Sequence, residues 1–179
     1  MNENAKVFYD SNSPVANRIR QKWSERIMVE VNTRVFGKIA VEDDKIIRFD
    51  SGILGFPDLK DFTLIYNLEK GNDSGIKWLQ SLQEPGFALP VMNPELIMAE
   101  YEPVFSQELL APLGDVENEE ILMFVTVTVP KDITKTTVNL RAPIMINVNT
   151  CKAVQLIADD ENYSIKYAIY DSLMATQHA

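Results

Sequence analysis

Alternating apolar positions form the clearest pattern in the chain, and they are densest in its last third. In Ile121–Val129, the odd-numbered side chains point to one side and the even-numbered ones to the other, as in a β-strand. The first half of this segment is apolar on both sides, which predicts a strand at the centre of the fold. Thr136–Leu140 and Ile144–Val148 predict the returning strands. We expect the rest of the domain to be organised around this ribbon.

Shorter segments with the same alternation follow one another along the chain, separated by turn-forming residues. They are Met28–Val35, Lys38–Val41, Lys45–Phe49, Phe62–Leu68, Lys77–Leu82, Phe87–Met92, Thr150–Ala158 and Tyr163–Ile169. Pro90 has no N–H to donate to a neighbouring strand, so we expect Phe87–Met92 at a sheet edge. Ser106–Leu113 predicts a short helix with Ser106 as its N-cap. Many short strands without a βαβ rhythm predict an all-β fold, an antiparallel barrel or sandwich with one or two short helices.

Charge separates an N-terminal segment from the rest of the chain. Residues 1–27 carry a net charge of +2 and the remainder carries −11, an asymmetry that is typical of an appended segment. This segment contains an apolar stripe with basic residues on both sides of it. The stripe consists of Val15, Ile19, Trp23 and Ile27. The stripe predicts either a short basic amphipathic helix that docks on an acidic surface or a loosely attached, disordered extension. We predict one β domain over residues 28–170 and a frayed tail over residues 171–179.

Size and composition indicate a soluble, cytoplasmic protein. The 179 residues suit one domain, and the single cysteine, Cys151, cannot form an internal disulfide. The chain contains no secretory signal and no apolar run long enough to span a membrane. The net charge of −9 disfavours direct nucleic-acid binding, which needs cations to replace the counterions of phosphates. The same charge permits a basic protein partner, although plain solubility explains it as well.

Catalytic chemistry has little support in the sequence. The only histidine, His178, is the penultimate residue, and no histidine lies near Cys151 in any fold we expect. The chain lacks the usual metal, phosphate-loop and dinucleotide motifs, so we expect no metal and no cofactor. These observations favour a binding protein over an enzyme. An enzyme or small-ligand binder with carboxylates in a barrel mouth stays open as an alternative, as does a purely structural assembly subunit.

Several short strings then reveal a resemblance. They are Gly52-Ile53-Leu54-Gly55-Phe56, Trp78-Leu79-Gln80-Ser81, Asn93-Pro94, Tyr101-Glu102-Pro103, Thr126-Val127-Thr128-Val129-Pro130 and Thr137 to Asn147. In their order and spacing, these strings resemble the flagellar assembly factor FliW family, over about Val29–Ile169. The resemblance implies a small β-barrel-like cytosolic protein that is not an enzyme. It also implies two alternative partners: flagellin, and the RNA-binding translational repressor CsrA, whose sequestration relieves repression of flagellin translation.

Candidate binding residues follow from these implied partners. A basic RNA-binding repressor suits acidic loops beside the central ribbon, so we expect CsrA to meet the carboxylates Glu117, Glu119, Glu120, Asp159 and Asp160. Flagellin suits an apolar or strand-edge contact, for which Trp78 and Tyr101 are candidates, unless both are core aromatics. Asn139 and Arg141 are unusual in a strand that only packs. They predict either a structural hydrogen bond or a partner contact.

Overall fold

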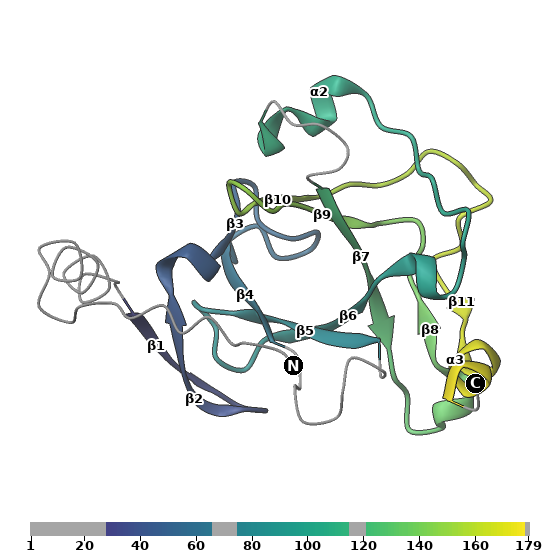
Figure 1. Cartoon of the computed structure of the whole chain (residues 1–179), viewed down its shortest axis with the longest axis horizontal. Helices are drawn as coiled ribbons and strands as arrows, with labels where there is room; N and C mark the ends of the chain where they lie inside the picture. The colour runs from purple at the N-terminus through teal and green to yellow at the C-terminus, as the bar shows by residue number, and fades with distance from the viewer. Residues whose placement is uncertain (1–27, 66–74, 115–120, 178–179) are drawn as a thin grey trace, which may run out of the picture.

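The computed structural model describes residues 28–65, 75–114 and 121–177 and contains mostly strands (Figure 1). The strands are β1 Met28–Thr33, β2 Gly37–Glu42, β3 Ile47–Phe49, β4 Asp61–Ile65, β5 Ile76–Ser81, β6 Ala88–Met92, β7 Ile121–Thr128, β8 Thr137–Val138, β9 Ile144–Asn147, β10 Lys152–Gln155 and β11 Tyr167–Ala168. The helices are α2 Gln107–Leu110, α3 Tyr170–Gln177 and the 3-10 turns η1 Asp43–Lys45, η3 Pro94–Leu96, η4 Ala111–Leu113 and η6 Ile133–Lys135. The predicted amphipathic segment at residues 15–27 lies outside the described ranges.

Seven strands close into a barrel, which confirms the predicted all-β class. The ring runs β3-β4-β5-β6-β7-β9-β10 and returns to β3. Every pairing in the ring is antiparallel except that between β10 and β3, which is parallel. Figure 1 looks into this ring, with the β1–β2 hairpin projecting on one side and α2 lying above β9 and β10. A closed ring leaves few free strand edges.

The strand β7 occupies the centre predicted from its sequence. It pairs with β6, β8 and β9, and it ends at Thr128, one residue before the predicted end. Its Phe124 belongs to a core inside the barrel, in which the Phe49 and Phe62 rings meet edge to face at 5.3 Å between centroids. Val125 and Val127, on the opposite face, pack in a second cluster outside the barrel wall. The barrel is therefore filled by side chains, and β7 has apolar layers on both faces.

The hairpin β1–β2 forms a separate two-stranded sheet, as its alternation and Gly37 predict. A hairpin of two strands is marginal alone, and here two contacts connect it to the barrel. The Phe36 and Trp78 rings meet edge to face at 6.0 Å, and the Arg34 N–H donates to the Pro85 carbonyl at 3.2 Å. Trp78 therefore joins β5 to the hairpin.

The prediction that Phe87–Met92 is an edge strand is wrong. The strand β6 lies between β5 and β7 in the barrel. Pro90 is tolerated because the ladder between β6 and β7 contains only Val91 and Met92. Pro90 therefore lies just before the segment of β6 that pairs with β7, so its missing N–H removes no hydrogen bond from that ladder.

Three predicted segments, one around the helix and two near the end of the chain, differ from the structure. The predicted helix Ser106–Leu113 is divided into α2 and η4, although the Ser106 hydroxyl does cap it by accepting the Leu109 N–H at 3.4 Å. The predicted strand Tyr163–Ile169 forms a strand only at β11, which pairs with β8, and the residues just before β11 form turns instead. The predicted frayed tail is helical up to Gln177, where α3 ends. In the described part of the chain, no helix has the length and apolarity needed to cross a membrane.

Candidate protein-binding site

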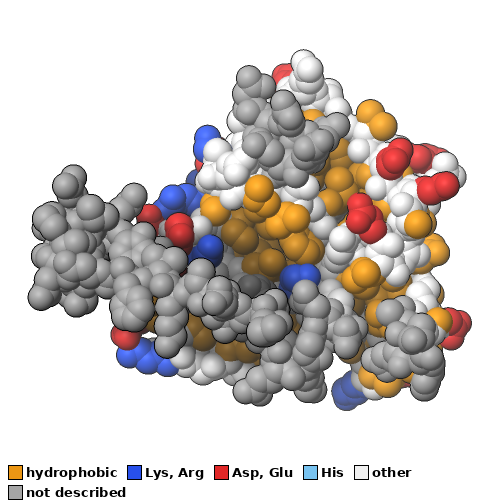
Figure 2. Space-filling view, in the orientation of Figure 1, with side chains coloured by type: hydrophobic (Ala, Val, Ile, Leu, Met, Phe, Trp, Pro, Cys, Tyr) orange, Lys and Arg blue, Asp and Glu red, His pale blue; other side chains and the backbone are white. Residues whose placement is uncertain are grey.

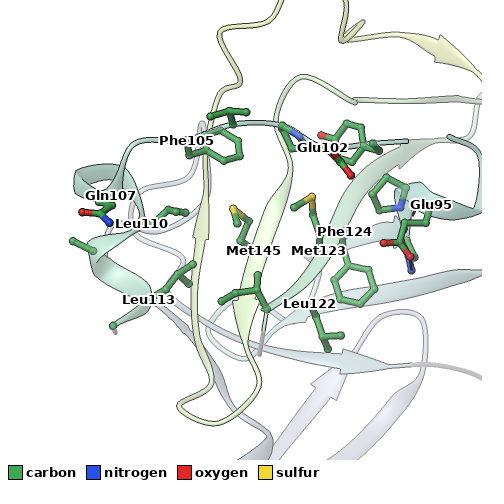
Figure 3. Close-up of a pocket in the computed structure, with 18 of the residues that line it drawn as sticks. Glu95, Glu102, Phe105, Gln107, Leu110, Leu113, Leu122, Met123, Phe124 and Met145 are labelled. Atoms are coloured by element: carbon green, nitrogen blue, oxygen red, sulfur yellow. Dashed lines mark hydrogen bonds between the residues drawn. The ribbon is translucent and has the colours of Figure 1, made fainter. Parts of the chain in front are cut away.

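An open apolar hollow of about 1590 Å³ lies at one mouth of the barrel. Figure 2 shows hydrophobic side chains gathered in it at the centre of this face. Its apolar lining, here named the mouth hollow, comes chiefly from Leu64, Phe105, Leu110, Leu122, Phe124 and Met145. Figure 3 shows Phe105, Leu110 and Leu113 on one side, Glu95 on the other, and Met123 and Met145 between them. Exposed apolar concavities of this kind are typical of protein-interaction sites.

The hollow exists because β6 leaves β7 early. After Met92, the Asn93 side chain accepts the Glu95 N–H at 3.0 Å and starts the 3-10 turn η3. Pro94 has no N–H, so it cannot extend the ladder. Beyond this point no strand of the described residues pairs with β7 on that side, and the side chains of Leu64 in β4 and Leu122 in β7 line the hollow. Leu122 is accordingly 47% exposed, although it lies in the most apolar part of the sequence.

Three charged side chains border the mouth hollow. The Lys77 ammonium lies 5.6 Å from the centre of the Phe124 ring, a cation–π distance, and Lys77 is half-buried. Glu95 and Glu102 are exposed and also line the hollow. Among the described residues, the border therefore carries two carboxylates and one ammonium, which favours a partner with a positive charge next to its apolar part.

Tyr101 holds the wall of the hollow to the barrel. Its hydroxyl donates to the Leu140 carbonyl at 2.5 Å, and its ring meets Tyr163 edge to face at 4.8 Å between centroids. The Glu102 N–H donates to the Tyr163 hydroxyl at 3.2 Å. Burial, together with the neighbouring Tyr163, raises the pKa of Tyr101 well above its usual value near 10. Tyr101 is only 6% exposed, so its position favours the core role over a direct partner contact.

The two other strand candidates, Asn139 and Arg141, have different roles. The Asn139 side chain accepts the Arg141 N–H at 3.1 Å, and the Asn139 N–H donates to the Thr126 carbonyl at 3.0 Å. Arg141 offers its carbonyl to the Ala158 N–H at 2.8 Å, while its half-exposed guanidinium has no ion pair among the described residues. Asn139 therefore shapes the turn between β8 and β9, and the guanidinium of Arg141 is available to a partner.

The string around Trp78 also has a structural basis. Gln80 is fully buried, and its amide donates to the carbonyls of Ser81, Pro85 and Phe87 at 2.9, 3.3 and 3.1 Å. These bonds hold the turn between β5 and β6, which in turn receives the β1–β2 hairpin.

The acidic candidates are only partly described. Asp159 and Asp160 are exposed, and an Asp160 oxygen accepts the Asn162 N–H at 2.9 Å. Tyr163, in the same loop, accepts the Glu102 N–H, so this loop contacts the segment that carries Glu102 on the border of the mouth hollow. Glu117, Glu119 and Glu120 lie outside the described residues. The structure thus places one acidic loop beside the wall of the mouth hollow.

Sequence reasoning missed the residues that form the hollow itself. The alternation in the sequence predicts Leu122, Met123 and Phe124 in a buried central strand, and nothing in it distinguishes Phe105 and Leu110 from other apolar residues. The one signal for a hollow in the sequence is an apolar run that ends at the turn-forming Pro94, followed by a second apolar segment. The same pattern is equally typical of a packed core, so it does not predict a hollow.

Known proteins similar to this chain agree with one another. A family model described as FliW protein matches residues 30–169. A flagellar assembly factor FliW of Lachnospira eligens is 49% identical over 146 residues, which cover 81% of this chain and 97% of that protein. The homologue of Lachnoclostridium phytofermentans is 45% identical over 79% of this chain and 90% of its own length. A crystal structure of the flagellar assembly factor FliW superposes with a TM-score of 0.72 at 30% identity, covering 79% of this chain and 96% of the other.

Proposed function

This chain belongs to the FliW family, which is not an enzyme family, and from that membership we propose that it acts in flagellar assembly in the cytoplasm. We propose further that it does so by binding other proteins. Its partners are flagellin and the translational repressor CsrA, which it binds as alternatives. When flagellin is absent, the protein sequesters CsrA and thereby relieves repression of flagellin translation.

The observation that carries this proposal is the mouth hollow. It exposes Leu122, with Phe124 and Met145 behind it, to solvent on one face of the barrel. Burying such a surface against a partner removes apolar area from water, at about 25 cal/mol per Å². An extended or helical apolar segment of flagellin is a suitable occupant.

The acidic loop supports CsrA as the second partner. A repressor that binds RNA presents a basic face, and Asp159, Asp160 and Glu102 offer carboxylates next to the mouth hollow. Because exposed charges mainly steer association, the acidic loop is expected to set the rate and salt dependence of CsrA binding. The two surfaces are neighbours, so one bound partner hinders the other.

Titration calorimetry with purified CsrA and purified flagellin, separately and in competition, tests the proposal. We expect each partner to bind, and prior addition of flagellin to abolish the heat of CsrA binding. A gel-shift assay with flagellin mRNA then measures whether the protein restores free RNA in the presence of CsrA. Absence of binding to both proteins would leave only a purely structural role in assembly.

A further inference from the structure

The first half of β7 has one paired edge and one edge that no described strand covers. On one side, Ile121–Phe124 pair residue by residue with Ile144–Asn147 of β9. On the other side, β6 pairs only with Val125 and Thr126. No further strand in the described ranges pairs with β7 on that side. Ile121–Phe124 therefore present an open strand edge.

The backbone groups on this open edge belong to Ile121 and Met123. The Thr126 carbonyl accepts the Asn139 N–H on the side of β7 opposite to β6. The N–H and C=O groups of successive residues alternate between the two sides of a strand. Those of Val125, Met123 and Ile121 consequently point to the β6 side. Val125 meets β6 there, whereas Met123 and Ile121 lie beyond its end.

Side chains from both faces of β7 line the same hollow. Phe124 belongs to the core inside the barrel and Met123 to the clusters outside it, yet both line the mouth hollow, together with Ile121 and Leu122. Consecutive side chains of a strand point to opposite faces. They can border one space only where the edge of the strand opens into that space. The mouth hollow therefore surrounds the open edge, as the arrangement of Leu122, Met123 and Phe124 in Figure 3 shows.

We propose that this edge is a strand-addition site, at which an extended segment of the partner protein pairs with Ile121 and Met123. The proposal rests on the protein-binding function proposed above and specifies how the mouth hollow is filled. An occupant that covers the hollow removes water from these backbone groups, which then need hydrogen-bond partners. A helix satisfies only its own backbone and would leave them unpaired. An extended segment satisfies them and continues the sheet.

The lining defines the chemistry of the segment. On one face its side chains meet Leu122 and Phe124, and on the other they meet Met123 and Met145. The segment is therefore apolar at successive positions rather than at alternate ones. A basic residue beside it faces the exposed carboxylate of Glu102. An apolar segment with a basic flank is thus the expected occupant.

Hydrogen exchange of single amides, followed by NMR on the full chain with and without purified flagellin, tests this proposal. In the free protein, we expect slow exchange at Leu122 and Phe124, whose N–H groups face β9, and fast exchange at Ile121 and Met123. With flagellin bound, exchange at Ile121 and Met123 slows by at least about tenfold, as for newly hydrogen-bonded amides. Binding without this slowing would overturn strand addition and leave the proposed function intact. Slow exchange at both amides already in the free protein would also overturn it, by showing that a segment of the chain itself covers the edge.

A matched pair of variants provides a second test. Met123→Pro removes the methionine side chain and, of the backbone groups, only the N–H that faces the open edge; a proline is tolerated at an edge strand in that orientation. Met123→Ala keeps this N–H and removes the side chain. We expect flagellin affinity to fall at least about tenfold further in Met123→Pro than in Met123→Ala, the size of a strong interface contact. Equal affinities in two folded variants would overturn the proposal. If Met123→Pro does not fold, the exchange measurement on the unaltered chain decides.

Discussion

The two halves of β7 have different surroundings. Val125–Thr128 lie between β8 and the end of β6, and Val125 and Val127 are 0% and 4% exposed. Ile121–Phe124 have β9 on one side and the mouth hollow on the other, and Leu122 is 47% exposed. The more apolar half of the strand is thus the more exposed one. Local hydrophobicity exceeds what the fold of one chain buries, as expected where a partner completes the core.

Opposite charges placed in the two halves should give the largest difference. Val125→Asp places a carboxylate where no solvent and no cation can reach it, and it should lower the free energy of unfolding by about 4 kcal/mol or more. Leu122→Asp places the same group at the border of the hollow, where we expect a change within about 1 kcal/mol. Urea unfolding followed by circular dichroism measures both. A comparable loss of stability in Leu122→Asp would contradict the assignment of this half as a binding surface. The same variant should weaken flagellin binding.

Tyr101 connects the wall of the hollow to the barrel, so its loss should affect the exposed half through the fold. Tyr101→Phe leaves the buried Leu140 carbonyl without its donor and should lower stability by about 1–3 kcal/mol at neutral pH. The effect has a pH signature. Because the folded state raises the pKa of Tyr101, the unfolded chain releases this proton first, at pH values above about 10.

The free energy of unfolding should therefore fall as the pH rises past about 10, by up to about 1.4 kcal/mol per pH unit for this group. Below that pH the contribution of Tyr101 is fully present. Thermal unfolding of the unaltered chain and of Tyr101→Phe, measured between about pH 8 and about pH 11, separates Tyr101 from the other tyrosines. Parallel stability curves would show that its proton is not held by the fold.

The sequence predicts the strands better than their surroundings. Alternation and turn residues identify β7 and β9 and the β1–β2 hairpin, because a period of two is a local property. The fate of an apolar run depends on residues far away. Whether Leu122 faces a core or a hollow is decided by Asn93 and Pro94, which end β6 about thirty positions earlier. The edge prediction for Pro90 failed for the same reason, since pairing with β7 stops just short of it.

The turn between β8 and β9 lies beside β7 and contains two polar residues with different roles, Asn139 and Arg141. Asn139→Ala removes the acceptor of the Arg141 N–H and should lower stability by about 1 kcal/mol. Arg141→Ala leaves both backbone bonds of the turn and should change stability by less than about 0.5 kcal/mol. Equilibrium unfolding of the two variants measures which substitution lowers the free energy of unfolding more. If Arg141→Ala proves the more destabilising, the guanidinium has a structural partner rather than an exposed, available position.

The smallest effect on stability, and the most selective one on binding, is expected at the acidic loop. Asp159 is exposed and has no hydrogen bond to another described residue, unlike Asp160, which accepts the Asn162 N–H. Asp159→Lys should therefore leave stability within about 0.5 kcal/mol. It should slow the association of CsrA at low salt, and this difference should shrink at high salt, since screening weakens steering. Flagellin association, which we propose depends on the apolar edge of β7, should change less. Stopped-flow measurements with both partners at two ionic strengths give the answer: equal slowing for both would mean that the acidic loop and the open half of β7 act as one surface.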